Sequence, residues 1–350
     1  MARTTFDALI ESSGKENRRQ QIAFSETNLK KMEYYNKHYQ IVTDLYFVAN
    51  APVKLCDHKK AMERECRFCG RSKPEVNFRK KAHAVPEFLG NKSLISMNEC
   101  DICNKFFADE YEDHLAKWFG PMRSLCQMRG KKGAPKYKSD EFTSARGDKG
   151  MELFVNSDSS ILKEIKESGS GSFKIPVPMY TQPFIPVRAA KAFIKSAISI
   201  LPQELLSECE NTIQWLLGKA TVNIDNFPVM YAFTPGVNPY RIGKAMICRR
   251  KMPDAEMPFL WLIIATTNFL FQIMIPFCKS DRWIKHGKKN SFEVTKFPTP
   301  FPEEYEKKYG KTVWYCEDWA SDNPVVQNRE ASFHVDKIEE INVNKKKNKK

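Results

Sequence analysis

The sequence predicts an α+β protein in which a small zinc-stabilised module precedes a domain with an antiparallel sheet and a helical hairpin. The module is predicted by two C-x-x-C pairs, Cys66–Cys69 and Cys100–Cys103. Two such pairs supply the four thiolates of a tetrahedral zinc site, and the chain between them is long enough for a β-hairpin. The larger domain is predicted by helical periodicity after Val187, followed by runs of β-branched and aromatic residues.

Composition sets the class of protein. The chain has 350 residues, of which 42% are hydrophobic, so it can form two or three domains and is not disordered throughout. Its net charge of +14 favours a polyanionic partner, of which nucleic acid is the usual one. Four of the ten cysteines fall in the two pairs, and the first residues are followed by charged positions rather than an apolar run. We therefore expect a reducing, cytoplasmic location with metal-bound thiolates.

One apolar run has the length of a membrane span, from Pro258 to Phe277. Polar residues at 266–268 and at Gln272 interrupt it, and many of its residues are β-branched or aromatic. We therefore expect two buried strands joined by a tight turn and no membrane partner.

The chain divides into five expected units, separated by changes in composition. A polar segment with a helix from Thr27 to about Val48 is expected to buttress the zinc module. The units are residues 1–55 (this polar segment and helix), 56–139 (zinc domain), 140–175 (linker), 176–335 (α+β accessory, sensor or targeting domain) and 336–350 (basic tail).

Periodicity places the remaining elements. A helix follows Cys103 and ends at Gly120, which puts the second cysteine pair at a helix N-terminus. The helical hairpin and the strands of the larger domain are expected at Val187–Leu201, Glu204–Leu217, Phe227–Phe233, Ala245–Arg249, Phe259–Ala265 and Phe269–Ile275.

Basic residues surround the cysteine pairs and occupy a glycine-containing loop. A run of Lys and Arg is usually a solvated face, but next to a zinc module it can contact several phosphates. The residues expected to bind nucleic acid are Arg67, Arg71, Arg79, Lys80, Lys81, Lys131 and Lys132.

His83 lies in an extended segment between the cysteine pairs, three residues before Pro86. A lone histidine is usually structural, but Asn104 directly follows the last cysteine, so the start of the helix would carry it toward a hairpin bearing His83. That arrangement suits a ββα-metal site, in which zinc holds hairpin and helix together and a catalytic groove crosses them. Cys56 and His58, just before the first pair, are an alternative set of zinc ligands. The other interpretation is that they belong to a loop without a role in metal binding.

The stretches CRFCG, KAHAVPEFLGN and ECDICNKFF resemble the HNH endonuclease family, in the subgroup whose final histidine is replaced by asparagine. The resemblance covers residues 66–119. It implies a treble-clef-like, ββα-metal HNH domain that hydrolyses DNA phosphodiester bonds with a divalent cation, Mg²⁺ or Mn²⁺. Proteins of this kind occur in bacteria, some in defence or mobile-element contexts, and act on double-stranded DNA.

The resemblance also implies roles for individual residues. His83 would be the general base that activates water, and Asn104 would ligate the cation. The asparagine that orients the histidine is either Asn91 or Asn98, and spacing leaves both open. The chain departs from the family at Ala82, where many members carry a metal ligand.

Hard cations prefer carboxylates, so the oxygen missing at residue 82 has to come from elsewhere. Asp109 is the nearest candidate on the helix, and Asp113 lies further along. Asp101 and Glu112 are further alternatives.

Two other classes of function remain open. Because residue 82 is alanine, the chain could be a zinc-stabilised nucleic-acid-binding protein without catalysis. Alternatively, the zinc element is only structural, and the C-terminal domain binds a regulatory protein or ligand.

Overall fold

The structure is a computed structural model that describes residues 25–48, 51–57, 63–130, 133–147, 150–167, 173–220, 224–284 and 294–335. It is a mixed α+β fold with antiparallel sheets, as the sequence predicts. Lys131, Lys132, His58 and the basic tail lie outside the described residues. Among the described helices, none is long and apolar enough to cross a membrane.

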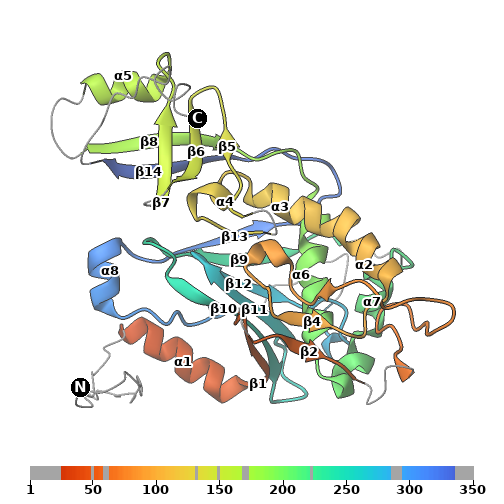
Figure 1. The fold of residues 1–350 in the computed structure, drawn as a ribbon. Coiled ribbons are helices and arrows are strands. Elements are labelled where there is room, and N and C mark those ends of the chain that lie inside the picture. The colour runs from red at the N-terminus through yellow and green to blue at the C-terminus, as the bar shows by residue number, and fades with distance from the viewer. Residues whose placement is uncertain are drawn as a thin grey trace, which may run out of the picture.

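The centre of the fold is a six-stranded sheet in the order β1-β10-β11-β12-β9-β13, with every neighbouring pair antiparallel (Figure 1). The strands are β1 (Tyr39–Tyr46), β9 (Pro228–Phe233), β10 (Tyr240–Arg250), β11 (Leu260–Thr267), β12 (Phe269–Met274) and β13 (Val313–Asp318). The apolar run that matches a membrane span in length forms β11 and β12, joined at Thr267, which has a positive φ of 48°. The expectation of two buried strands and a tight turn is therefore confirmed.

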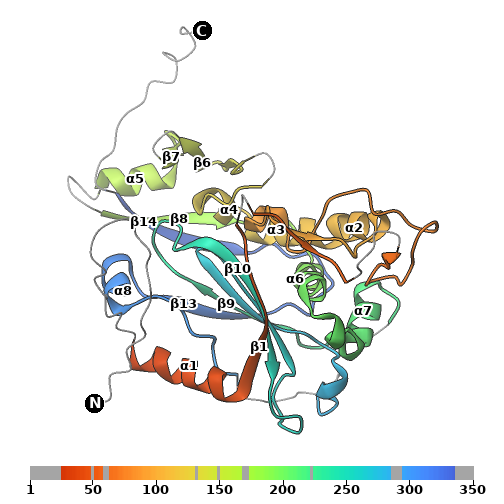
Figure 2. The same ribbon diagram turned by 60° about the horizontal axis from the view of Figure 1, so that its bottom comes forward.

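The two faces of this sheet enter different apolar clusters. On β10, Ala245 and Ile247 belong to one cluster, while Met246 and Cys248 belong to the other, as the period of two in a strand requires. The first cluster contains residues of helix α6 (Pro186–Ile200) and of the cysteine-containing module. Helix α1 (Glu26–His38) covers the opposite face, near α8 (Glu303–Tyr309) (Figure 2).

Helix α1 differs from the expectation in length and in place. The helix ends at His38, and Tyr39 is already extended, with φ −127° and ψ 152°, because the following β-branched residues pair with β10. The expectation that it buttresses the zinc module is wrong: Tyr35 packs on the far face of the sheet, where its hydroxyl donates to the Thr295 carbonyl at 2.7 Å.

The cysteine-containing module consists of short strands and one helical stretch, α2-η3-α3, interrupted by a π-helical turn and called the bent helix below. Its small sheet has the order β2-β4-β3, with β2 parallel and β3 antiparallel to β4. The elements are β2 (Val53–Leu55), β3 (Ala82–His83), η2 (Glu87–Leu89), β4 (Leu94–Ser96), α2 (Asp101–Phe107), the π-helical η3 (Ala108–Glu112), α3 (Asp113–Phe119) and α4 (Met122–Leu125). The helix ends at Gly120 as expected: φ is +46° there, and a Cβ would lie 3.3 Å from the Lys117 oxygen.

The segment expected to be a linker, residues 140–175, forms strands and a helix over much of its described part. Phe142, Ile161 and Met179 form a small apolar core between a three-stranded sheet, a helix and a two-stranded sheet. The elements are β5 (Tyr137–Lys138), β6 (Phe142–Gly147), β7 (Gly150–Val155), α5 (Ser160–Glu167), β8 (Phe173–Tyr180) and β14 (Asn328–Val335). Isolated apolar residues in a polar segment gave too weak a pattern to predict the β6–β7 hairpin, and the partner of β8, β14, lies far along the chain.

The helical hairpin of the larger domain is present, with a change in its second arm. α6 matches the predicted helix, and the second arm begins as a 3₁₀ helix, η4 (Gln203–Cys209), before α7 (Glu210–Leu216). A short 3₁₀ turn, η5 (Lys279–Asp281), follows the sheet. One apolar cluster contains Phe107 and Trp118 of the module together with Phe193 and Phe271 of the larger domain. The division into five units stays a prediction, but the two central units share a core.

Candidate functional site around the cysteine cluster and His83

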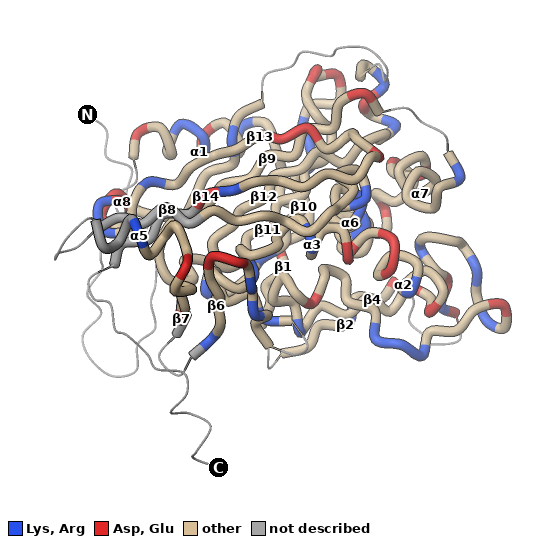
Figure 3. The backbone as a smooth tube through the Cα atoms, turned by 90° about the horizontal axis from the view of Figure 1, so that it is seen from above, with Lys and Arg blue, Asp and Glu red and all other residues tan. Residues whose placement is uncertain are grey.

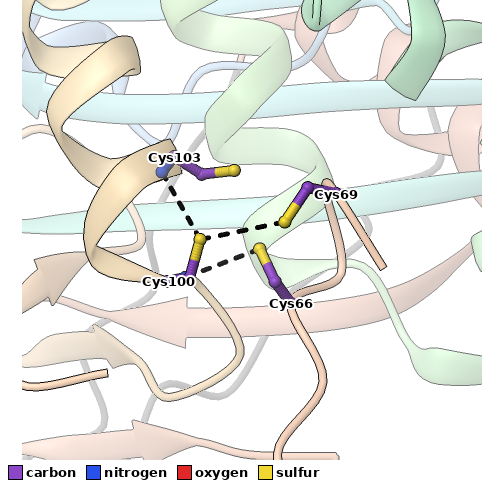
Figure 4. Close-up of side chains that lie close together, drawn as sticks. All are labelled: Cys66, Cys69, Cys100 and Cys103. Atoms are coloured by element: carbon purple, nitrogen blue, oxygen red, sulfur yellow. Dashed lines mark hydrogen bonds between the residues drawn. The ribbon is translucent and has the colours of Figure 1, made fainter. Parts of the chain in front are cut away.

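Four cysteines lie together between a loop and the start of α2. The Sγ atoms of Cys66, Cys69, Cys100 and Cys103 all lie within 4.8 Å of one another, with 3.8 Å between those of Cys69 and Cys100 (Figure 4). Tetrahedral zinc, with Zn–S bonds of about 2.3 Å, places its sulfurs about 3.8 Å apart. The cluster therefore fits a structural metal ion.

Two of the cysteine sulfurs accept backbone N–H groups. Cys100 is the N-cap of α2, and its sulfur accepts the Cys103 N–H at 3.5 Å. The Cys66 sulfur accepts the Cys100 N–H at 3.5 Å. Hydrogen bonds from Cys103 and Cys66 lower the pKa of the Cys100 thiol.

His83 lies on a short hairpin that comes in the chain between the two cysteine pairs. It pairs with Ile95 on β4, and the next residue, Ala84, donates its N–H to the Leu94 carbonyl at 3.0 Å. The side chain of His83 is 18% exposed, and its Nε2 lies 4.0 Å from a carboxylate oxygen of Glu87. The extended conformation predicted for this histidine is confirmed, and its imidazole keeps access to solvent.

Asn91 holds the loop of this hairpin. It is fully buried, and its amide nitrogen donates to the carbonyls of Val85 and Leu94 at 2.7 and 3.1 Å. Its oxygen accepts the N–H groups of Ser93 and Leu94 at 3.1 and 2.8 Å. Leu94 is bonded to Ala84, the residue after His83, so the Asn91 amide holds the strand β4 one residue from the partner of the histidine.

Asn98 has a different place. Its oxygen accepts the Asp57 N–H at 2.9 Å, and its backbone carbonyl accepts the Arg67 N–H at 2.9 Å. These contacts join the cysteine-containing loop to residue 57. Of the two candidate asparagines, Asn91 is therefore the one that contacts the hairpin loop of His83.

A buried charged cluster lies beneath the hairpin, and sequence reasoning missed it. Lys195 of α6 is fully buried and donates from Nζ to the backbone carbonyl of His83 at 2.8 Å. The same nitrogen lies 3.1 Å from Glu99 and 3.5 Å from Glu112. A lysine is rarely fully buried, and this one lies far along the chain from His83, so the sequence offers no signal for the contact.

The surroundings of these groups set their protonation. Burial lowers the pKa of His83 below its usual value, and Lys81 and Lys195 act in the same direction against Glu87 and Glu112. The imidazole is therefore mostly neutral at neutral pH.

The pKa values of the two buried partners, Glu99 and Lys195, are both raised. Burial raises the pKa of Glu99 to about 7, against the opposing effect of Lys195. Burial alone would lower the pKa of Lys195, but Glu99 and Glu112 outweigh it and raise the pKa. Lys195 is therefore charged at neutral pH.

The acidic residues of the bent helix separate into two groups. Asp109 pairs with Lys105, and Asp113 pairs with Lys117 at 2.6 Å, on exposed positions. Asp101 accepts the backbone N–H groups of residues 79 and 80 at 2.9 and 2.8 Å. Only Glu112, at the end of the π-helical segment, contacts the Lys195 group beneath His83. A π-helical turn contains one extra residue, which rotates the residues that follow it about the helix axis. A ranking of the acidic residues that assumes a regular α-helix does not include this rotation.

Arg67, expected to bind nucleic acid, has a side chain that is buried and bonded within the protein. Its side chain is 6% exposed, and two of its nitrogens bond to Asp57 at 2.5 and 3.0 Å. Its Nη1 donates to the carbonyls of Ile198, Ser199 and Leu201, at the end of α6, at 2.7, 3.2 and 3.0 Å. With its nitrogens so engaged, this arginine joins the cysteine-containing loop to α6.

The other expected contacts remain at the surface where they are described. Arg71, Arg79, Lys80 and Lys81 are exposed. Figure 3 shows Lys and Arg positions distributed over many elements, with acidic positions between them. The structure therefore offers a local basic segment before His83 rather than one continuous basic face in that view.

Comparison with known proteins identifies one segment. Residues 66–119 match the family model described as HNH endonuclease. This segment contains both cysteine pairs, the hairpin of His83 and the bent helix, and the match points to nuclease activity on nucleic acid. No curated protein and no solved structure matches the chain.

Proposed function

We propose that the chain is a metal-dependent HNH endonuclease that hydrolyses phosphodiester bonds of double-stranded DNA, with His83 as the general base. One observation carries the proposal. Within the segment that matches the family, a partly exposed histidine with a lowered pKa lies on a hairpin that comes in the chain between the two pairs of a four-cysteine cluster. The order hairpin then helix supports assigning this unit to the ββα-metal, treble-clef-like architecture.

The chemistry follows from the state of His83. A neutral imidazole accepts a proton from water, and the resulting hydroxide attacks the scissile phosphorus in line with the leaving 3′-oxygen. Asn91 holds β4, the strand that pairs with His83, and so supports the backbone that carries the imidazole. A divalent cation, Mg²⁺ or Mn²⁺, would stabilise the charge that develops on the phosphate when it is bound.

The four cysteines are proposed to hold zinc in a structural role, because four thiolates leave no open position for substrate. The described residues bring together no other group of three His, Cys, Asp or Glu that could hold a metal. A magnesium ion needs only one or two protein oxygens when substrate phosphate and water complete its shell. Asn104 remains the proposed ligand from the family position, and Glu112 is the helix carboxylate on the His83 side.

The experiment is plasmid cleavage by the purified chain with Mg²⁺ or Mn²⁺, beside His83→Ala and an EDTA control. We expect metal-dependent nicking or cutting that the His83 variant loses by at least about 100-fold. The matched control is His114→Ala, because His114 lies on α3 and accepts the Ile185 N–H at 3.1 Å, away from the hairpin.

The second candidate is a zinc-stabilised nucleic-acid-binding protein without catalysis. Ala82 favours it, since this residue is 1% exposed and pairs with Ser96, so the strand carries no acid at the usual ligand position. Duplex binding by both proteins without cleavage under any metal condition would support this candidate and reject the nuclease.

A further inference from the structure

Helix α6 lies outside the segment that matches the family, yet it bonds to that segment at two places, the backbone of His83 and the side chain of Arg67. Lys195 bonds to the backbone carbonyl of His83, and three carbonyls at the end of the helix accept Arg67 of the cysteine-containing loop. The helix also packs against η3 and α3. The hairpin, the cysteine-containing loop and the bent helix are thus all held against one element.

The burial of Lys195 is costly, which makes its position informative. Its side chain is 1% exposed and that of Glu99 is fully buried. Moving an ion pair out of water is expensive, and apolar residues of similar volume often give equal or higher stability. Among the described residues, Glu99 has no hydrogen-bond partner that meets ordinary geometry, despite the 3.1 Å approach of Lys195. Although Glu99 and Glu112 favour the charged form of Lys195, a buried ion pair is weak evidence for a stabilising role.

We propose that Lys195 is a positioning residue for the nuclease reaction: its ammonium group holds the His83 carbonyl and Glu112 together beneath the hairpin. The inference rests on the proposed function. Lys195 does not touch substrate, because it is buried, and it acts through the backbone of His83. Lys195, which lies outside the family segment, then helps to hold the proposed base, His83, in position.

The test compares three variants of the full-length chain in plasmid cleavage. Lys195→Met removes the donor and keeps the length of the side chain, and Lys195→Met/Glu99→Gln also removes the carboxylate left without its partner. The matched control is Lys191→Met, one turn earlier on α6, where Nζ donates to the Trp215 carbonyl at 3.0 Å. Zinc content and thermal unfolding are measured for each, so that kinetics are compared only among folded proteins.

We expect kcat to fall by about 100-fold in both Lys195 variants, with KM changed by less than about twofold, because a misplaced base loses rate rather than binding. Lys191→Met should keep the wild-type kcat. The His83 ring signals in an NMR spectrum, assigned by their loss in His83→Ala, should shift in the Lys195 variants and not in Lys191→Met.

Two results would overturn the inference in distinguishable ways. If the wild type cleaves and the folded double variant does so with wild-type kcat, Lys195 is only structural and the nuclease proposal stands. If the wild type does not cleave under any metal condition, the nuclease proposal fails and takes the inference with it.

Discussion

At the scale of single residues, the state of His83 decides the pH dependence of the proposed reaction. Burial lowers the pKa of the imidazole, so the active neutral form persists to more acidic pH than for an exposed histidine. We expect kcat/KM, which reports groups of the free enzyme, to be constant at neutral pH and to fall about tenfold per pH unit below the lowered pKa. The measurement is a pH–rate profile at constant ionic strength. A rate that still rises between pH 7 and 9 would show that another group is the base.

Also at the scale of single residues, alanine substitutions at Asn91 and Asn98 are expected to differ in their effect on kcat. Asn91→Ala leaves several buried backbone groups unpaired, so we expect a loss of about 2–4 kcal/mol in the free energy of unfolding, along with a large loss of kcat. Asn98→Ala should instead weaken the junction between residue 57 and the cysteine-containing loop, with kcat retained in the folded fraction. Denaturant unfolding and cleavage assays of both variants separate the two. Equal loss of kcat would contradict the assignment of Asn91 to the hairpin.

At the scale of elements, the cysteine cluster joins the loop of residues 66–70 to α2. We expect one zinc ion per chain, and we expect Cys69→Ser or a strong chelator to lower the thermal midpoint by at least about 5 °C. Cys316→Ser is the matched control, because Cys316 is an exposed residue of β13 outside the cluster. Metal analysis and calorimetry measure both effects. Zinc retained at full stoichiometry in Cys69→Ser would contradict the four-cysteine site.

The sequence predicted those elements whose pattern is local. The C-x-x-C spacing predicted the cluster, and uninterrupted apolar runs predicted β11 and β12. Helix α1 was predicted too long because aromatic residues at helical spacing continue into β1, whose identity depends on pairing with β10. The pairing of β8 with β14 and the contact of Lys195 with His83 depend on partners far along the chain, which a single sequence does not reveal.

The exposed basic segment before His83 gives a prediction about binding. Arg79, Lys80 and Lys81 are exposed, whereas Arg67 is enclosed by Asp57 and the end of α6. Replacing the three exposed residues by alanine should reduce the slope of log binding constant against log salt by about one for each phosphate that the protein no longer neutralises. Arg67→Met should leave that slope unchanged and destabilise the fold by about 3–5 kcal/mol. Fluorescence anisotropy over a salt series measures the slopes, and an unchanged slope in the triple variant would exclude this segment from the interface.

At the scale of the whole molecule, the family segment depends on the rest of the chain. Phe107 and Trp118 belong to the same apolar cluster as Phe193 of α6 and Phe271 of β12. The side chain of Trp118 also donates from Nε1 to Glu317 of β13 at 3.3 Å. The larger domain is therefore part of the structure that holds the site, in addition to any role in sensing or targeting.

Deleting the residues after Gly150 tests this dependence. A sensor or targeting role for residues 176–335 predicts that such a truncation would change regulation or targeting. The structure leads us to expect a different outcome: the fragment exposes the apolar side of the bent helix, lacks Lys195, and loses the three carbonyls that accept Arg67. It should therefore lose cooperative unfolding and cleavage together. A chain trimmed to residues 25–335, which keeps every described helix and strand, should retain both properties. Calorimetry and plasmid cleavage are measured for both truncations. A stable fragment that ends at Gly150 and cleaves with wild-type kcat would show that residues 66–119 form a site independent of α6.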